Sequence, residues 1–302
     1  MKRRDFVRNT GLGLLSASFL TSEAVAELAK KKTLLSLQLY SIRDHMKTDP
    51  VGTIKALSKI GYKDCEHAGY NDQKRQFYGH SPEEWKKILA DNGMTMQSGH
   101  SVFGKQHWNF DKKELADVWK TTVEDSVKAG QKYIISPWLD VSLRKNFDDL
   151  KQFMDAFNVC GEYCKKQGIR YGYHNHDFEF SLKLTSKRVY DIILENTDPK
   201  LVAQQLDIGN MYGGGGRAME LLKQYPGRFE LLHVKDEVDN GKGGHESGIL
   251  GTGIIGVQEI LKTSVNAGPT FYLIIEQESY QGKDPVACMK ENYDVMKKWG
   301  YA

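Results

Sequence analysis

Strand-like and helix-like segments alternate along the chain from about residue 33 to its C-terminus, and this alternation constrains the fold more than any other feature. We count eight such pairs, the pattern of repeated βα units with parallel strands. The predicted strands are Leu34–Tyr40, Tyr62–His67, Thr95–Gly99, Tyr133–Ser136, Arg170–His174, Leu201–Asp207, Phe229–Val234 and Thr270–Glu276. The predicted helices are Val51–Ile60, Pro82–Asn92, Lys113–Ala129, Phe147–Gln167, Arg188–Glu195, Ala218–Gln224, Gly256–Ala267 and Asp284–Trp299.

Two architectures fit such an alternation. A doubly wound open sheet usually starts with a glycine-rich phosphate loop after its first strand. This chain instead continues Leu39-Tyr-Ser-Ile-Arg43 after its first predicted strand. We therefore predict an α/β fold of the (β/α)8 TIM-barrel type, formed by residues 33–302 as a single catalytic domain, since such barrels are typically about 250 residues long.

Potential metal ligands gather at the ends of the last four predicted strands. The stretch from Tyr171 to Phe180 contains several of them, and Asp207, His233 and Glu276 each end one of the three strands that follow. In a parallel barrel the C-terminal ends of all strands lie on one rim, where the active site forms. Imidazole and carboxylate groups together suit Mn, Co, Zn or Mg. We therefore predict one divalent metal ion at this rim.

Other polar and aromatic residues are expected on the same rim. Tyr40, His67, His100 and Trp138 lie at or just after the ends of the first four strands, where they would bind a sugar; purely structural roles are the alternative. Lys235, directly after the strand that carries His233, is a candidate substrate or acid/base group.

The N-terminus carries an export pattern. Basic residues at positions 2–4 precede the short apolar run Gly11–Leu20, and Ala24-Val-Ala26 offers a small-residue cleavage site. Arg3-Arg4 resembles a twin-arginine motif. We therefore expect residues 1–26 to be a twin-arginine-type signal, residues 27–32 to be a linker, and the mature protein to be periplasmic without a stable membrane anchor.

The overall charge argues against one class of partner. The formal net charge is only +3 in 302 residues, with basic and acidic residues mixed. A nucleic-acid surface would need a concentrated basic patch. We therefore expect a small carbohydrate partner and no nucleic acid.

Five segments, taken in order, resemble the xylose-isomerase-like barrel family of sugar isomerases and epimerases. They are Tyr173-His-Asn-His176, Leu206-Asp-Ile-Gly209, Leu232-His-Val-Lys-Asp236, Gly251-Thr-Gly253 and Ile274-Ile-Glu276. The resemblance implies a catalytic metal held by Glu, Asp, His and Glu from strands five to eight. Asp207, His233 and Glu276 match the last three positions. It also suggests a homodimer.

The first ligand position departs from the family pattern. His174 stands where many relatives carry Glu, and His176 and Glu179 follow closely, so the fourth ligand is one of these three, with His174 favoured by strand register. In the family's epimerases, that Glu and the last Glu act as paired acid/base groups. Here Glu276 is the expected base, with His176 or Glu179 as the second group and Lys235 as a further candidate.

The resemblance implies a metal-dependent sugar isomerase or epimerase that removes a proton next to a carbonyl and proceeds through an enediolate. The export signal favours a non-phosphorylated or keto sugar. Two alternatives remain open: a metal-dependent lyase or hydratase on 3-keto-glycosides or keto-inositols, and a periplasmic sugar-binding barrel without catalysis.

Overall fold

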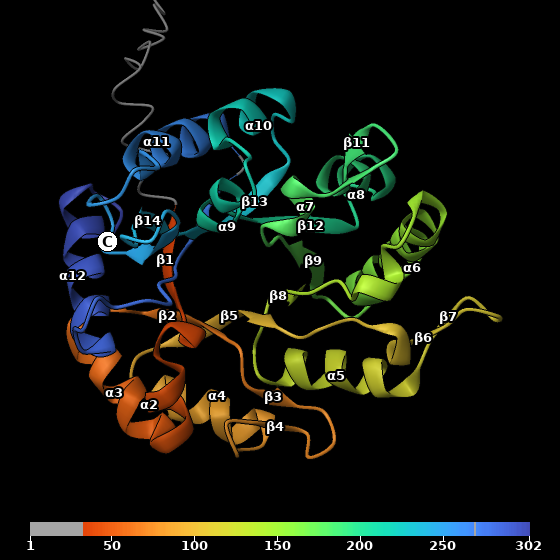
Figure 1. The fold of residues 1–302 in the computed structure, drawn as a ribbon. Helices are drawn as coiled ribbons and strands as arrows, with labels where there is room; N and C mark the ends of the chain where they lie inside the picture. Colours follow the sequence, from red (N-terminus) through yellow and green to blue (C-terminus); the bar gives the residue numbers. More distant parts are fainter. Residues whose placement is uncertain (1–32, 269) are drawn as a thin grey trace, which may run out of the picture.

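Eight parallel strands close into a barrel in the computed structural model, which describes residues 33–268 and 270–302 (Figure 1). The order around the barrel is β1-β16-β13-β12-β9-β8-β5-β2, so the chain winds once around the axis. The strands are β1 Leu34–Gln38, β2 Asp64–His67, β5 Thr95–His100, β8 Tyr133–Ser136, β9 Arg170–His174, β12 Val202–Asp207, β13 Phe229–Val234 and β16 Tyr272–Ile275. The predicted (β/α)8 barrel is confirmed. The predicted signal and linker, residues 1–32, lie outside the described residues.

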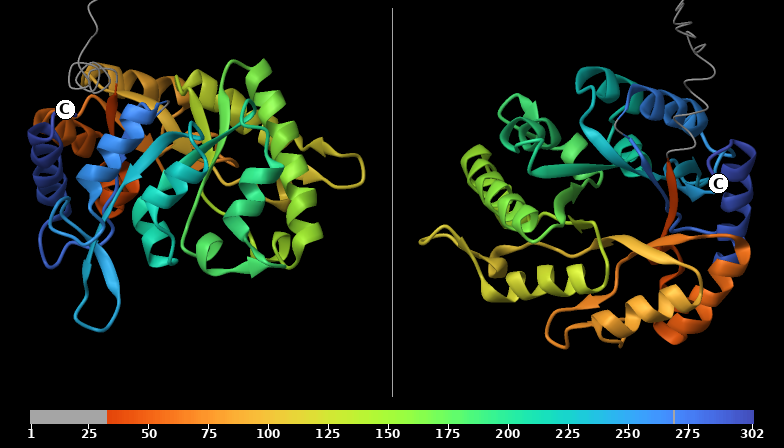
Figure 2. Two further views of the ribbon diagram at one scale, coloured as in Figure 1. Left: turned by 90° about the horizontal axis from the view of Figure 1, so that it is seen from above. Right: turned by 180° about the vertical axis from the view of Figure 1, so that it is seen from behind.

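Helices surround the strands as an outer ring (Figure 2). They are α2 Arg43–Thr48, α3 Pro50–Ile60, α4 Pro82–Asp91, α5 Asp117–Lys128, α6 Phe147–Lys166, α7 Phe178–Ser181, α8 Val189–Asn196, α9 Ile208–Gly213, α10 Ala218–Gln224, α11 Val257–Ala267 and α12 Pro285–Lys298. Short 3-10 helices are η1 Leu39–Ile42, η2 Lys105–His107 and η3 Val141–Leu143. Within the described ranges, none of the helices has the length and apolar character needed to cross a membrane.

Among the residues that the structure describes, four short hairpins are built into the connections. They are β3 Tyr70–Asn71 with β4 Gln76–Phe77, β6 Trp108–Asn109 with β7 Glu114–Leu115, β10 Lys183–Leu184 with β11 Lys187–Arg188, and β14 Asp236–Asp239 with β15 His245–Gly248. The β6–β7 and β14–β15 hairpins project from the body of the molecule (Figure 2).

Two element boundaries that differ from the sequence prediction have a local structural cause. Helix α5 starts at Asp117 rather than at Lys113, because Glu114 and Leu115 pair with β6. The first strand ends at Gln38 rather than at Tyr40, because the backbone turns there into η1 and the Gln38 side chain accepts the Tyr40 N–H.

Helix α6 shows how the outer ring is held to the barrel. Phe153, Phe157 and Cys160 recur at helical spacing along its inner face and are fully buried. Phe157 lies with its ring centroid 5.2 Å from that of Tyr171 on β9, and Cys160 Sγ accepts a hydrogen bond from Trp119 of α5. Burying aromatic side chains of this size contributes roughly 2–3 kcal/mol each, so this layer holds α5 and α6 firmly against β9.

The barrel interior is apolar in its middle and polar at its C-terminal end. Tyr133, Ile135, Ala203, Leu231, Tyr272 and Ile274 form a separate buried cluster. Because side chains alternate along a strand, the residues two positions beyond Leu231 and Ile274 face the same interior. His233 and Glu276 are those residues, and the barrel core thus positions the site above it.

Candidate metal centre and cavity

His174, Asp207, His233 and Glu276 come together at the C-terminal rim of the barrel. Each offers one donor atom, and all four atoms lie within 4.8 Å of one another. All four side chains are buried, with at most 5% of each residue exposed. Asp207 pairs with His233 in the β12–β13 register. Four residues from four neighbouring strands thus aim their donor atoms at one point.

The hydrogen bonds of the two histidines fit metal binding. Nδ1 of His174 lies 2.9 Å from Oε1 of Gln205, and Nε2 of His233 lies 2.7 Å from Oε1 of Glu66. When these nitrogens donate to the oxygens, the second nitrogen of each ring carries a lone pair. Those nitrogens, Nε2 of His174 and Nδ1 of His233, each lie 3.9 Å from Oδ2 of Asp207.

Asp207 provides the test of whether a cation fits. Its Oδ1 accepts the Asn210 N–H at 2.7 Å and so caps α9, whereas the buried Oδ2 accepts no hydrogen bond. Burial raises the pKa of this carboxyl to about 6 despite the nearby Lys235 charge. The Lys235 Nζ lies 3.1 Å from Oδ2 without a hydrogen bond to it, and a metal ion would give this buried acceptor a directly bonded partner. Two imidazole nitrogens with two carboxylate oxygens favour Mn, Co or Zn over Mg.

Glu66 on β2 is a functional candidate that the sequence analysis missed. It is fully buried, and its carboxylate accepts hydrogen bonds from Gln38 and Gln205 besides contacting His233. A carboxylate behind a ligating histidine orients the ring and increases its basicity. The alternation of side chains along a strand was the available signal, because it places Asp64 and Glu66 on one face of β2 and His67 on the other.

His67, one residue further, therefore faces the other way. Its ring packs edge-on against Phe77 at 4.8 Å, is fully buried and does not line the cavity. Burial lowers the pKa of this imidazole to about 3. The structure thus does not bring His67 to the expected sugar-binding surface, since adjacent residues in a strand point to opposite faces.

Two carboxylates raise the affinity of His233 for a proton. Burial by itself would lower the pKa of this imidazole, but Glu276 at 3.0 Å and Glu66 at 2.7 Å raise it to about 10. A metal ion bound at Nδ1 would take the place of one proton, as metal ligation generally requires.

Lys235 reaches the same carboxylates. It lies two residues beyond His233 and thus on the same side of the chain, with its Nζ 3.0 Å from Glu276, 3.1 Å from Asp207 and 2.6 Å from Glu278. Burial opposes the charge of Lys235, but these carboxylates raise its pKa well above the usual value. Gly209 makes room for the lysine, because a Cβ there would come within 2.7 Å of the Lys235 stem.

The motif residue next to Lys235 has a structural role. Oδ2 of Asp236 accepts the backbone N–H groups of Gly251 and Gly253 at 2.8 and 3.1 Å. These bonds tie the segment after β15 to Asp236, which starts β14 just beyond the strand that carries His233.

His176 and Glu179, the two rival positions for the fourth ligand, lie in different surroundings. His176 lines the cavity, and its buried Nδ1 has no hydrogen-bond partner. Burial, with a contribution from the Lys235 charge, lowers the pKa of His176 to about 4.

Glu179 is fully buried outside the cavity, where its carboxylate accepts from the Tyr173 hydroxyl and from the His176 N–H. Burial raises the pKa of Glu179 to about 8. The structure therefore groups His174, not Glu179, with the other three donors, and Glu179 holds the His176 backbone in place.

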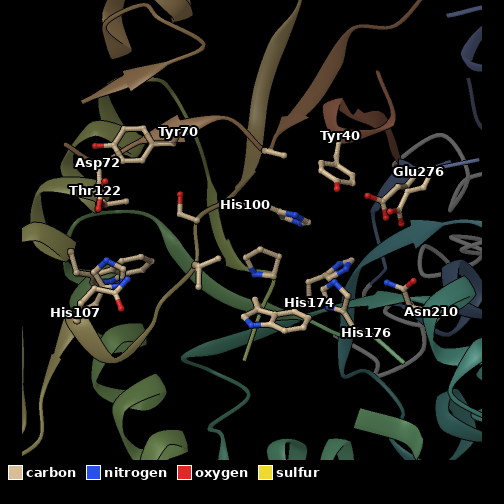
Figure 3. Close-up of a pocket in the computed structure, with 18 residues that line it drawn as sticks. Tyr40, Tyr70, Asp72, His100, His107, Thr122, His174, His176, Asn210 and Glu276 are labelled. Carbon is tan, nitrogen blue, oxygen red and sulfur yellow. The ribbon is translucent and has the colours of Figure 1, made fainter. Parts of the chain in front are cut away.

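The cluster opens into a cavity of about 510 Å³ (Figure 3). Its lining near the cluster includes Tyr40, His100, Trp138, His174, His176 and Glu276. Tyr40 and Trp138 keep 43% and 41% of their surface exposed, so both rings are free to contact a ligand. Within the described part of the chain, the lining carries acidic groups but no Lys or Arg side chain.

Comparisons with known proteins agree with this fold. Residues 54–299 match the family described as "Xylose isomerase-like TIM barrel". An inosose dehydratase from Clostridium perfringens is 26% identical over 174 residues, which cover 53% of this chain and 56% of that enzyme. The match thus spans about half the length of that relative.

Solved structures extend the likeness to the whole barrel. A sugar phosphate isomerase/epimerase from Parabacteroides distasonis superposes with a TM-score of 0.74 and 25% identity, covering 88% of this chain and 96% of that one. A 3-keto-D-glucoside 4-epimerase from E. coli superposes with a TM-score of 0.63 and 14% identity, covering 88% and 99%. These relatives are dehydratases, epimerases and isomerases, and the chain belongs to the xylose isomerase-like TIM barrel family.

Proposed function

We propose that this protein is a metal-dependent lyase that removes the proton next to the carbonyl of an uncharged keto-sugar or keto-inositol and expels a substituent from the next carbon. One observation carries the proposal: the buried donors His174, Asp207, His233 and Glu276 lie beside a cavity that His174 and Glu276 line and that, among the described residues, has no Lys or Arg in its wall. When bound there, a divalent ion would polarise a carbonyl oxygen and acidify the adjacent C–H.

The absence of cationic side chains from the cavity lining supports an uncharged substrate. Phosphate groups in proteins are typically held by Arg or Lys and by clustered backbone N–H groups. Lys235 lies beside the cluster, and it is already paired with three carboxylates. A phosphorylated sugar would also meet the negative charges of Glu276 and Glu278 on the cavity wall.

His176 is the group we propose to move the proton. Its Nδ1 is free of hydrogen bonds, and its ring lies beside His174 and against Trp138, with centroid distances of 5.2 Å to each. His176 would take the proton from the carbon next to the carbonyl as a C=C bond forms. The bond to the substituent on the next carbon breaks, and His176 returns the proton to the departing oxygen, so that water or an alcohol leaves.

His174, at the first metal-ligand position, favours elimination over two-base epimerisation. A histidine there cannot provide the carboxylate that, by family resemblance, pairs with Glu276 across the substrate carbon. Elimination needs only one proton-transfer group, because the same group can remove the proton and return it to the leaving oxygen on one face of the substrate. The similarity to an inosose dehydratase points in the same direction.

Epimerisation is the second candidate, favoured by the similarity along nearly the whole chain to a sugar phosphate isomerase/epimerase. It would share the first proton transfer. The two outcomes differ only in whether the intermediate is reprotonated or loses a substituent.

The test is elemental analysis of the purified protein, followed by incubation with free keto-hexoses and keto-inositols in D2O and proton NMR. Bound Mn, Co or Zn with an unsaturated ketone as product would support the lyase. Deuterium at the carbon beside the carbonyl, with inverted configuration and no elimination, would support the epimerase. Tight sugar binding with neither exchange nor metal would overturn both and leave a sugar-binding barrel.

A further inference from the structure

The cavity continues well beyond the metal cluster. Its far part, which we call the distal lobe, is lined by Tyr70, Asp72, Gln106, His107 and Thr122 (Figure 3). These residues come from the β3–β4 hairpin, from η2 and from α5. In Figure 3 the labelled residues of the distal lobe lie on the opposite side of His100 from His176, Asn210 and Glu276. None of them takes part in the chemistry proposed at the cluster.

The distal lobe is anchored to the barrel framework. The Tyr70 hydroxyl donates to Oδ2 of Asp125 at 2.7 Å, and Nε of Arg75 donates to the same carboxylate at 2.9 Å. Asp125 lies on α5 with 1% of its surface exposed. On another wall, Nδ1 of His107 accepts the Gly104 N–H at 3.0 Å. Because these wall residues are already held in place, they lose little conformational freedom when a ligand binds, and this increases affinity.

The chemistry of the lining fits a sugar ring. Asp72 and Gln106 offer an acceptor and an amide to hydroxyl groups, and neither side chain makes a hydrogen bond to another described residue. Val102 and Trp138 also line the cavity, each with 41% of its surface exposed. Pockets that combine apolar walls with a few directed polar groups bind small neutral ligands, and about 510 Å³ is within the usual range for ligands of drug size.

We propose that the distal lobe is a subsite for a second sugar ring attached to the reacting one, so that the substrate is a keto-glycoside rather than a free keto-sugar. This inference rests on the proposed function, because the reacting ring must lie at the metal cluster. The second ring then contacts Trp138 and reaches Asp72 and Gln106 with its hydroxyl groups.

The experiment compares a keto-disaccharide with the corresponding free keto-hexose. The wild-type enzyme should have at least a tenfold higher kcat/KM for the disaccharide. The double variant Asp72→Ala/Gln106→Ala should reduce kcat/KM for the disaccharide roughly tenfold more than for the free sugar, through KM, because it removes hydrogen bonds that only the second ring makes.

The matched control is Gln73→Ala/Asp111→Ala. It removes the same two residue types from the turns of the β3–β4 and β6–β7 hairpins, and both side chains lie outside the cavity lining. It should leave both substrates unaffected. Equal kcat/KM for the two substrates, or an equal loss in both double variants, would overturn the subsite.

Failure of the proposed function gives a different result. If neither substrate turns over, calorimetry with a non-reacting disaccharide and its monosaccharide still tests the lobe. Tighter binding of the disaccharide that is lost in Asp72→Ala/Gln106→Ala supports the subsite, and equal binding of the two sugars contradicts it.

Discussion

Oε1 of Glu66 lies 2.7 Å from Nε2 of His233, on the side of the imidazole that faces away from Asp207 and Glu276. The two residues are 167 positions apart in the sequence. This contact joins the polar network of β1, β2 and β5 to the four donors of β9, β12, β13 and the end of β16. Gln205 extends the link, because its amide contacts Glu66 at 2.6 Å and His174 at 2.9 Å.

Glu66→Gln should weaken the binding of Mn or Zn by about 10- to 100-fold while leaving the barrel folded. The amide keeps the shape and one acceptor but removes the charge that makes His233 basic, an effect typical of groups behind a metal ligand. Isothermal calorimetry measures the change. Asp64→Asn, a buried carboxyl on the same strand but outside the donor cluster, is the control and should bind metal normally.

Asp207→Asn should abolish stoichiometric metal binding and reduce turnover by at least about 100-fold, because a neutral amide replaces a charged donor. The cap of α9 should survive, since the Asn side-chain oxygen can still accept the Asn210 N–H. Asp207→Ala should lose the metal and also about 1 kcal/mol of stability with the cap. Full activity of either variant in the presence of chelator would contradict the metal assignment.

His176→Asn should lower kcat by about 10²- to 10⁴-fold, the usual contribution of a proton-transfer group. Metal content should not change, because His176 is outside the group of four donors. Elemental analysis and D2O exchange measured on the same sample separate the two effects. Loss of the metal together with activity would instead identify His176 as a ligand. His45→Asn, away from the cavity lining, is the control.

Asp64 should make the fold less stable as the pH rises. Burial raises the pKa of this carboxyl from 3.8 to about 7, against hydrogen bonds from Thr95 and Ser36 that lower it. Between these values the folded chain binds a proton that the unfolded chain has lost. The contribution of Asp64 to the free energy of unfolding is therefore fully present below about pH 4 and decreases by up to ~4 kcal/mol as the pH rises through 7.

Denaturant unfolding of wild type and Asp64→Asn at several pH values measures this term. From about pH 4 to pH 8, the unfolding free energy of the wild type should fall relative to that of Asp64→Asn. Parallel curves over that range would show that Asp64 does not hold its proton in the folded state.

The sequence alone was sufficient for the barrel, because apolar periodicity and helix caps are local signals. Ser81 and Glu84, for example, form the capping box at the start of α4. Strands β8, β9 and β13 begin and end where the pattern predicts. The β14–β15 hairpin is not among the predicted strands, because its pairing has no strong apolar alternation.

For the site, the sequence predicted which residues would meet but not how they would be supported. His174, Asp207, His233 and Glu276 stand at strand ends, and barrel topology brings such ends together. Their role as metal ligands, like the export of the protein, stays a prediction. Only the tertiary structure decided that Glu66 rather than His67 faces inward, that His176 and not Glu179 lines the cavity, and that the cavity extends to the β3–β4 hairpin. These outcomes depend on strand parity and on contacts between residues far apart in the sequence, and no local pattern encodes them.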